Sequence, residues 1–166
     1  MMNFDGTGQE TPPTEVVVPA EPTPESLINS GEFWPDIDPE QCRQEMRLDG
    51  TVTPERLRAA LIAAITQVQD TLAAWVIEQQ DKGCTTLAET TQRIVDGANI
   101  NEWRFKRAVY CYAAANTMER MRSFDTTAEG HKRADAVTDP IDDHRRDGQW
   151  AVSDILGRTR TFVELI

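Results

Sequence analysis

Residues 53–83 read TPERLRAALIAAITQVQDTLAAWVIEQQDKG, and this stretch decides the fold class of the chain. Thr53 followed by Pro54 is typical of a helix start, and Lys82 followed by Gly83 is typical of a helix end. At 1.5 Å per residue such a helix is roughly 40 Å long, which indicates an elongated protein. Apolar residues recur every three or four positions and predict one amphipathic helix: Leu57, Ala60, Leu61, Ala64, Ile65, Val68, Leu72, Trp75 and Val76.

The same start signal occurs on both sides of this helix. Asp38 precedes Pro39, and Asp139 precedes Pro140. An Asp side chain at this place accepts a hydrogen bond from the first turn, and a proline at the first helical position removes no intrahelical hydrogen bond. We therefore expect helices to begin at Pro39 and at Pro140, and the second of them to end at Gly157.

A further helix is predicted to begin after Asn101 and to run to about Arg122. Its centre, AVYCYAAA at residues 108–115, is apolar on every face, as in a helix that is surrounded by neighbours. This pattern places the helix at the middle of a bundle. Its aromatic residues are interpreted as core or subunit contacts and not as a cofactor site: Trp103, Phe105, Tyr110 and Tyr112.

The N-terminal residues differ from the helical body. Residues 1–32 hold five of the nine prolines and six carboxylates, with no Lys or Arg. Such a composition buries too little apolar surface to offset its ordering entropy, so we expect a disordered acidic arm before a helical domain at residues 33–166. Within the arm, Val16, Val17 and Val18 form a β-branched run that either adds to a neighbour's sheet or stays solvated.

The C-terminal residues also depart from the helical pattern. Residues 158–166 read RTRTFVELI, which is β-branched and aromatic without a helix cap, and they predict a short terminal strand. A lone strand in a helical chain has no long partner in its own fold. We expect it either to pair with a short local segment or to augment another subunit, an indication of oligomerisation.

The charge of the chain limits its partners. The formal net charge is -11, of which the arm carries -6 through its six carboxylates, leaving -5 for the rest. Duplex DNA and anionic membranes are disfavoured, because affinity for phosphates comes mostly from cations. The longest uninterrupted apolar run, residues 59–65, is far shorter than the roughly 20 residues that cross a bilayer, so we expect no membrane span. The N-terminus lacks the pattern of a secretory signal, and we expect a cytosolic chain.

Residues with catalytic or metal-binding chemistry are few. His131 and His144 have no Ser or Cys beside them in a nucleophile pattern, and the three cysteines lack metal-ligand spacing. We therefore expect a protein that is not an enzyme and that has no cofactor and no metal. Carboxylates do crowd near His144, where they form either a cation site or a solvated face paired with Arg145 and Arg146: Asp135, Asp139, Asp142, Asp143 and Asp147.

Residues 33–39, FWPDIDP, place two aromatic residues and an isoleucine in a turn-rich stretch. One interpretation is that Phe33, Trp34 and Ile37 fix the chain onto the first helices, as a hydrophobic staple does. The other is that they anchor into the pocket of a partner. Sequence alone does not separate the two.

Several strings, in order and at similar spacing over residues 33–166, resemble the head completion protein (GPL) family of contractile-tailed temperate phages. They are FWPDIDP at 33–39, MRLDGTVT at 46–53, RLR at 56–58, RAVY at 107–110, ERMRSFDTT at 119–127, RRD at 145–147, DILG at 154–157 and VELI at 163–166. Two departures from the family pattern are visible. Met121 replaces a more usual aromatic residue, and residues 139–148 are more polar.

This resemblance implies a structural virion protein with a mainly helical head-tail adaptor fold, made in the host cytoplasm and located in the neck. Its copies would form a dodecameric ring on the portal protein, bind a tail-side neck protein and let packaged DNA pass without specific binding. The expected contacts lie in both termini and the turn-rich stretch: Val16, Val17, Val18, Phe33, Trp34, Ile37, Phe162, Val163, Leu165 and Ile166. The alternative function is an acidic helical DNA mimic or an inhibitor of a nucleic-acid enzyme.

Overall fold

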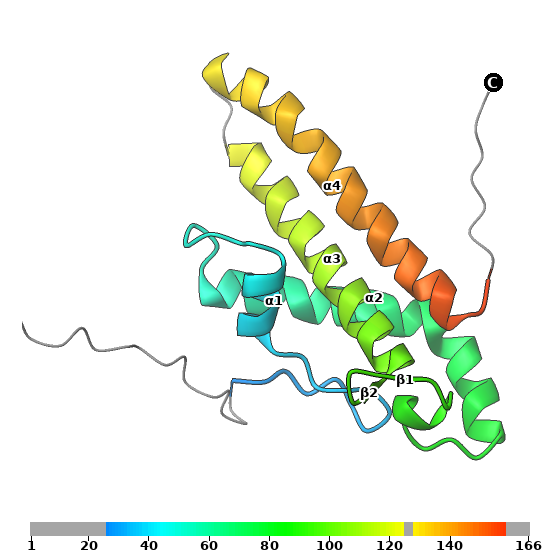
Figure 1. The fold of residues 1–166 in the computed structure, drawn as a ribbon. Coiled ribbons are helices and arrows are strands. Elements are labelled where there is room, and N and C mark those ends of the chain that lie inside the picture. The colour runs from blue at the N-terminus through cyan, green and yellow to red at the C-terminus, as the bar shows by residue number, and fades with distance from the viewer. Residues whose placement is uncertain (1–25, 125–127, 159–166) are drawn as a thin grey trace, which may run out of the picture.

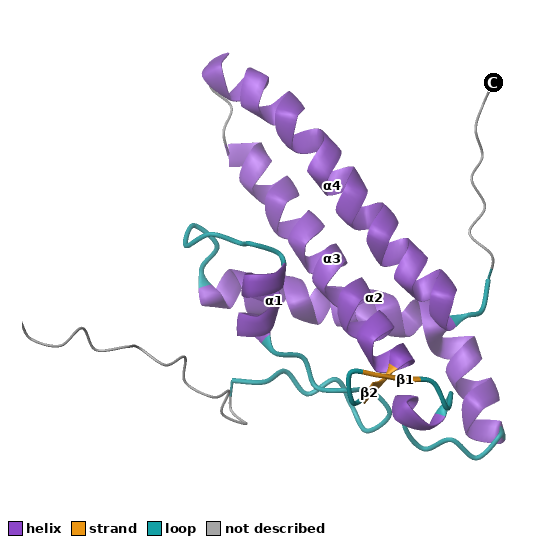
Figure 2. Cartoon of the chain, in the orientation of Figure 1, coloured by secondary structure: helices purple, strands orange, loops and turns teal. Residues whose placement is uncertain are grey.

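The computed structural model describes residues 26–124 and 128–158, and in these residues the protein is mainly helical, as predicted (Figures 1 and 2). The elements in chain order are α1 (Pro39–Glu45), α2 (Pro54–Asp81), the 3-10 helix η1 (Leu87–Glu89), β1 (Ile94–Val95), β2 (Ala98–Asn99), α3 (Ile100–Phe124) and α4 (Ala128–Ile155).

Helix α3 lies at the centre of the bundle, as its apolar sequence predicts. It runs beside α4 along its length, while α2 crosses the pair (Figure 1). Phe105 and Tyr110 are fully buried, and the short side chains of Ala108, Ala113 and Ala114 are buried beside them. These small residues let the neighbouring helices approach α3 closely, so α3 carries the core of the domain.

The predicted helix starts at Pro39 and Pro54 are confirmed. The Asp38 carboxylate accepts a hydrogen bond from the Glu40 N–H at 2.8 Å, and the Thr53 hydroxyl accepts one from the Arg56 N–H at 3.4 Å. The predicted stop at Gly157 is also confirmed, because this residue has a φ of 67°, which favours glycine.

The predicted helix start at Pro140 is wrong. Helix α4 begins at Ala128 and continues through Pro140, although an interior proline costs about 3 kcal/mol. Residues 128–139 read AEGHKRADAVTD, in which Ala, Glu, Lys and Arg are strong helix formers. Their propensity favours a longer helix alongside α3. An Asp-Pro pair therefore marks a helix start only where the preceding residues do not themselves form a helix.

The folded domain begins before residue 33. Residues 1–25 lie outside the described part, but Ile28 is buried and exchanges two backbone hydrogen bonds with Ile37 at 2.8 and 2.9 Å. Trp34 stacks on Phe105 with a ring-centroid distance of 4.6 Å, and the Phe33 carbonyl accepts the N–H of Leu87. The last residues of the proposed arm are thus part of the helical domain.

A short hairpin joins η1 to α3 and was not predicted. Its turn residues Asp96 and Gly97 have φ values of 50° and 74°, the positive values that a two-residue hairpin turn requires. The Asp-Gly pair was a readable signal for this turn. Next to it, the buried Asn99 amide donates to the carbonyls of Ala88 at 2.7 Å and Thr91 at 2.6 Å, and its oxygen accepts the Asn101 N–H.

We predict that Asn99→Ala destabilises the protein by about 3 kcal/mol, because two carbonyls and one N–H lose their partner at a buried position. Urea unfolding followed by circular dichroism measures the change. The control is Asn29→Ala, which removes one exposed turn hydrogen bond, to the Gly31 N–H, and should cost less than about 1 kcal/mol. Equal stability losses in the two variants would contradict the assigned role of Asn99.

We predict that Gly148→Leu destabilises the protein by about 1–2 kcal/mol. A Cβ atom at this buried position of α4 would lie 3.0 Å from the Tyr112 ring, and overpacking of this kind outweighs the gain in helix propensity. The matched control is Gln149→Leu, one residue further along α4 and exposed. If both variants unfold at the same urea concentration as the parent, the close packing of α3 on α4 at Gly148 is refuted.

Candidate functional site

The predicted contact residues near the two termini lie outside the described residues. These are Val16, Val17 and Val18 in the first segment and Phe162, Val163, Leu165 and Ile166 in the last. Their roles as contacts to other subunits or to a partner stay predictions.

The structure supports an intramolecular role for residues 33–37. Phe33 is 7% exposed and Ile37 is fully buried, so both side chains pack in the protein's own core and offer almost no surface to a partner. Trp34 is half-buried between Phe33 and Phe105. Of the two interpretations of this stretch, the structure fits the anchor onto the helices for Phe33 and Ile37, and a contact of these residues with a partner stays a prediction.

The aspartate cluster of α4 forms ion pairs with arginines. Asp143 pairs with Arg146 at 2.8 Å, and Asp147 pairs with Arg107 of α3 at 3.0 Å. Arg145 contacts Asp142 at 3.9 Å and also pairs with Glu119 of α3. Within residues 26–124 and 128–158, no group of three His, Cys, Asp or Glu side chains is arranged to hold a metal ion. Residues 142–147 of α4 thus fit the ion-paired face of the two interpretations, whereas the side chains of Asp135 and Asp139 lie outside the described part.

The buried thiols are held in their protonated form. Burial, reinforced by the nearby Glu45, raises the pKa of Cys42 to about 12, and burial with the nearby Asp147 raises the pKa of Cys111 to about 11. Burial also raises the pKa of the Tyr110 hydroxyl. A thiol attacks as a thiolate, so these two cysteines are inert at neutral pH and serve as small core residues.

Helix α2 has a second apolar face, opposite the one that packs on α3. Ile62 is 49% exposed and Ile77 is 60% exposed. We call the set to which they belong the outer α2 face; it is apolar except for Thr66 and Asp70 and consists of Ala59, Ile62, Ala63, Thr66, Asp70, Ala73, Ala74 and Ile77. A cavity of about 440 Å³ adjoins it at Ala59, between α2 and the end of α3.

By length and composition, α2 is also long and apolar enough to cross a membrane, although its longest uninterrupted apolar run is short. Only 33% of its most apolar window is buried in this structure. The apolar composition of α2 is explained in part by its packing on α3 and in part by the outer face, which has no cover within the described residues.

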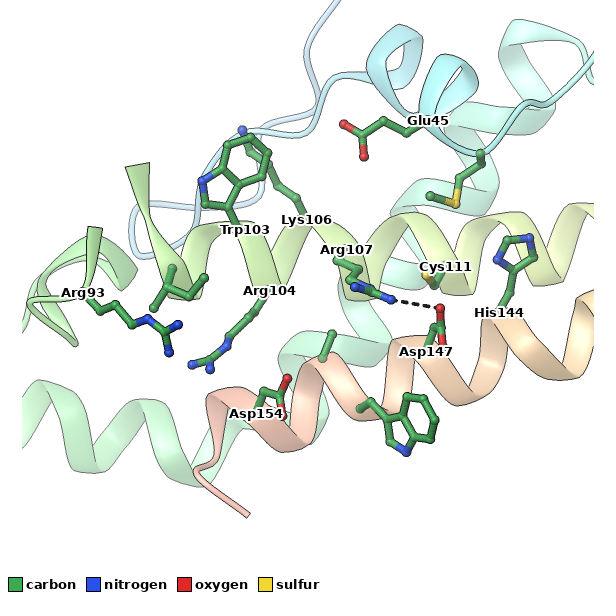
Figure 3. A pocket seen from close by; sticks show the side chains of 14 residues that line it. Glu45, Arg93, Trp103, Arg104, Lys106, Arg107, Cys111, His144, Asp147 and Asp154 are labelled. Carbon is green, nitrogen blue, oxygen red and sulfur yellow. Dashed lines mark hydrogen bonds and ion pairs between the residues drawn. The ribbon is translucent and has the colours of Figure 1, made fainter. Parts of the chain in front are cut away.

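A groove with a volume of about 730 Å³ lies between α1, the hairpin, α3 and α4 (Figure 3). We call it the α3–α4 groove. Arg104 and Arg107 extend from α3 on one side, and His144, Asp147 and Asp154 extend from α4 on the other (Figure 3). Its remaining walls are Glu45, Met46, Arg93, Ile100, Trp103, Lys106, Cys111, Trp150 and Ala151.

Sequence reasoning did not find this groove, because its residues come from four separate segments of the chain. One signal was available in α3, where Trp103, Arg104, Lys106 and Arg107 place three cations and an aromatic residue within five positions. No comparable signal marks the residues contributed by α1 and by the hairpin.

Comparisons with known proteins relate the chain to one kind of phage protein. A family model described as phage head completion protein (GPL) matches residues 28–166. The head completion/stabilization protein of Escherichia phage P2 is 37% identical over 151 residues, which cover 91% of this chain and 89% of that protein. The probable head completion/stabilization protein of Haemophilus phage HP1 (strain HP1c1) is 27% identical over 117 residues, 69% and 76% of the two chains. No solved structure matches.

The family match and the fold agree on where the domain starts. The match begins at Ile28, the residue whose hydrogen bonds to Ile37 open the folded domain, and it includes every helix described above. The resemblance found in the ordered sequence strings is thereby confirmed, and the chain belongs to the phage head completion protein (GPL) family.

Proposed function

We propose that the protein is a structural, non-enzymatic component of the phage virion whose copies form a ring on the portal in the neck. There it completes the DNA-filled head and offers the tail its attachment site. The observation that carries this proposal is the P2 relative, which is named as a head completion/stabilization protein and aligns with 91% of this chain. The portal protein, neighbouring copies and a tail-side neck protein are the proposed partners.

The outer α2 face supports self-association. It presents Ile62 and Ile77 to water about 22 Å apart along one helix, at 1.5 Å per residue. Contact between copies removes such a face from water and contributes roughly 25 cal/mol per Å² of apolar surface. A ring provides every copy with a neighbour, so this face is a reasonable contact between subunits.

The charge of the protein is consistent with the passage of DNA. With a net charge of -11, carboxylates that line the bore of a ring would repel phosphates and let DNA slide without binding. The alternative function as a DNA mimic is less well supported. A mimic needs an array of unpaired carboxylates on a folded face, whereas Asp143, Asp147 and Glu119 are paired with arginines.

The proposal is tested by mixing the purified protein with purified portal rings of the same phage and imaging the mixture by electron microscopy. We expect an added ring of density on one end of the portal, with one copy per portal subunit. Portal rings that show no added density at saturating protein concentration would refute portal binding.

We predict that the double variant Ile62→Asp and Ile77→Asp weakens association between copies at least about tenfold, because it places two carboxylates in an apolar contact. Analytical ultracentrifugation measures the association. The fold should survive, since exposed substitutions change stability by about 0.5 kcal/mol or less. The control, Gln44→Asp with Gln92→Asp, adds the same charge at exposed sites away from the outer α2 face. Equal weakening in both variants would mean that net charge, and not this face, controls association.

We predict that deletion of residues 159–166 abolishes ring or portal binding and leaves the helical circular dichroism signal intact, because the proposed terminal strand pairs with another subunit. The deletion starts after Arg158, whose N–H closes the end of α4 on the Ser153 carbonyl at 2.9 Å. Portal binding retained by the deleted chain would exclude the strand as an assembly contact.

A further inference from the structure

We propose that the acidic, proline-rich N-terminal segment of this chain, residues 1–25, binds in the α3–α4 groove. This binding is separate from the proposed ring in the phage neck and does not depend on it. It rests on complementary residue types: cations, tryptophans and exposed apolar residues at the groove, and carboxylates, prolines and valines in residues 1–25.

The groove is cationic in an otherwise acidic protein. Four cationic side chains, Arg93, Arg104, Lys106 and Arg107, face three carboxylates among its walls, in a chain with a net charge of -11. Arg107 is paired with Asp147. Arg93, Arg104 and Lys106 form no ion pair with any described residue. Arg104 donates a hydrogen bond to the neutral amide oxygen of Asn101 at 3.0 Å, which holds its side chain in place and leaves its charge uncompensated for an anionic segment.

Two tryptophans line the same groove, and both are half-buried. The Trp103 indole N–H donates to the Val95 carbonyl at 3.0 Å, which fixes the orientation of that ring. The Arg146 guanidinium lies 4.9 Å from the centroid of the Trp150 ring. Proline-rich segments bind to grooves lined with aromatic rings, because an extended proline helix has little entropy to lose and packs flat on a ring.

Two exposed apolar residues follow Arg93, one of the groove residues, along the chain. Ile94 is 60% exposed and Val95 is 43% exposed, and both follow Arg93 in the hairpin. Successive side chains of a strand point to opposite faces, so at most one of the two lies beside Arg93, where it suits a ligand that combines an apolar residue with a carboxylate.

Residues 1–25 have the three matching features. They contain five carboxylates and no Lys or Arg, five prolines, and the apolar run VVV at residues 16–18. Glu15 and Glu21 flank that run, and three of the prolines follow it. Carboxylates fit the cations that have no ion pair, prolines fit the tryptophans, and the valines fit an exposed apolar side chain of the hairpin.

The segment is long enough to reach the groove. Fully extended, 25 residues span at most about 85 Å, whereas a folded body of this size has a radius of gyration of about 14 Å. The groove of the same copy and that of a neighbouring copy are therefore both within reach. Nucleic acid is the weaker candidate occupant, because Glu45, Asp147 and Asp154 stand among the cations and repel a continuous run of phosphates.

Photo-crosslinking in the full-length protein tests the proposal. A benzophenone amino acid replaces Val17, the protein is irradiated, and mass spectrometry maps the crosslinked peptides. We expect the crosslinks to concentrate on residues 93–107 and 144–158, and their yield to fall steeply at 0.5 M NaCl, where charge interactions are screened. A mixture of isotopically heavy and light chains shows whether the segment binds its own copy or a neighbour; either result supports the proposal.

Two matched sets of variants distinguish binding to the groove from a general effect of the protein's charge. Arg93→Ala with Arg104→Ala and Lys106→Ala should lower the crosslink yield about tenfold, as expected for the loss of three partly exposed ion pairs. The control, Arg56→Ala with Lys82→Ala and Arg120→Ala, removes the same charge at exposed sites outside the groove and should leave the yield unchanged. Thermal unfolding verifies that both variants fold. Crosslinks scattered outside the groove, or equally reduced by both variants, would overturn the proposal.

Discussion

The fold depends on the burial of the central turns of α3 on all of their faces. Residues 108–115 include no charged side chain, and all but Tyr112 are buried. A helix of this kind is stable only when neighbours cover it completely, and each fully buried large apolar side chain contributes roughly 1.5–3 kcal/mol. Helix α2 covers one side and α4 another, while the Tyr110 hydroxyl lies within 3.4 Å of the Asp38 carbonyl at the start of α1.

The same constraint explains why α2 and α4 have different surfaces. Both need only one apolar stripe to cover α3. Helix α4 uses Ile141, Ala151, Val152 and Ile155 for its stripe and carries charged pairs elsewhere. Helix α2 is apolar on its outer side as well, although packing on α3 does not require it. This excess of apolar surface is what suggests a second contact for α2, since a solvated helix face is ordinarily polar.

The charges of the protein are also unevenly distributed. Carboxylates dominate the N-terminal segment, and cations gather in the α3–α4 groove, so the net value of -11 describes neither region. Arginines also bind α3 to α4 across the bundle, through Arg107 with Asp147 and Arg145 with Glu119. These pairs are largely exposed and contribute about 1 kcal/mol or less each to the free energy of unfolding. Their main effect is on which face of α4 packs against α3.

Much of the fold was predictable from local patterns. The starts of α1 and α2, the end of α4 and the central place of α3 follow from caps and periodicity, which act within a few residues. The hairpin at Asp96 and Gly97 carried a readable turn signal as well. The continuation of α4 through Pro140 was not predictable from the Asp-Pro pair, because the same two residues occur at a helix start and, at a tolerable cost, inside a helix.

The sequence by itself determined the helical class, the acidic N-terminal segment and the family, since each depends on residue type and order along the chain. Only the tertiary structure decided that Phe33 and Ile37 are core residues, that no described residue covers one face of α2, and that cations from the hairpin and α3 line one groove. The physical reason is distance along the chain. Arg93 and Asp147 are 54 positions apart, and no local preference for helix, turn or cap specifies that the two line the same groove.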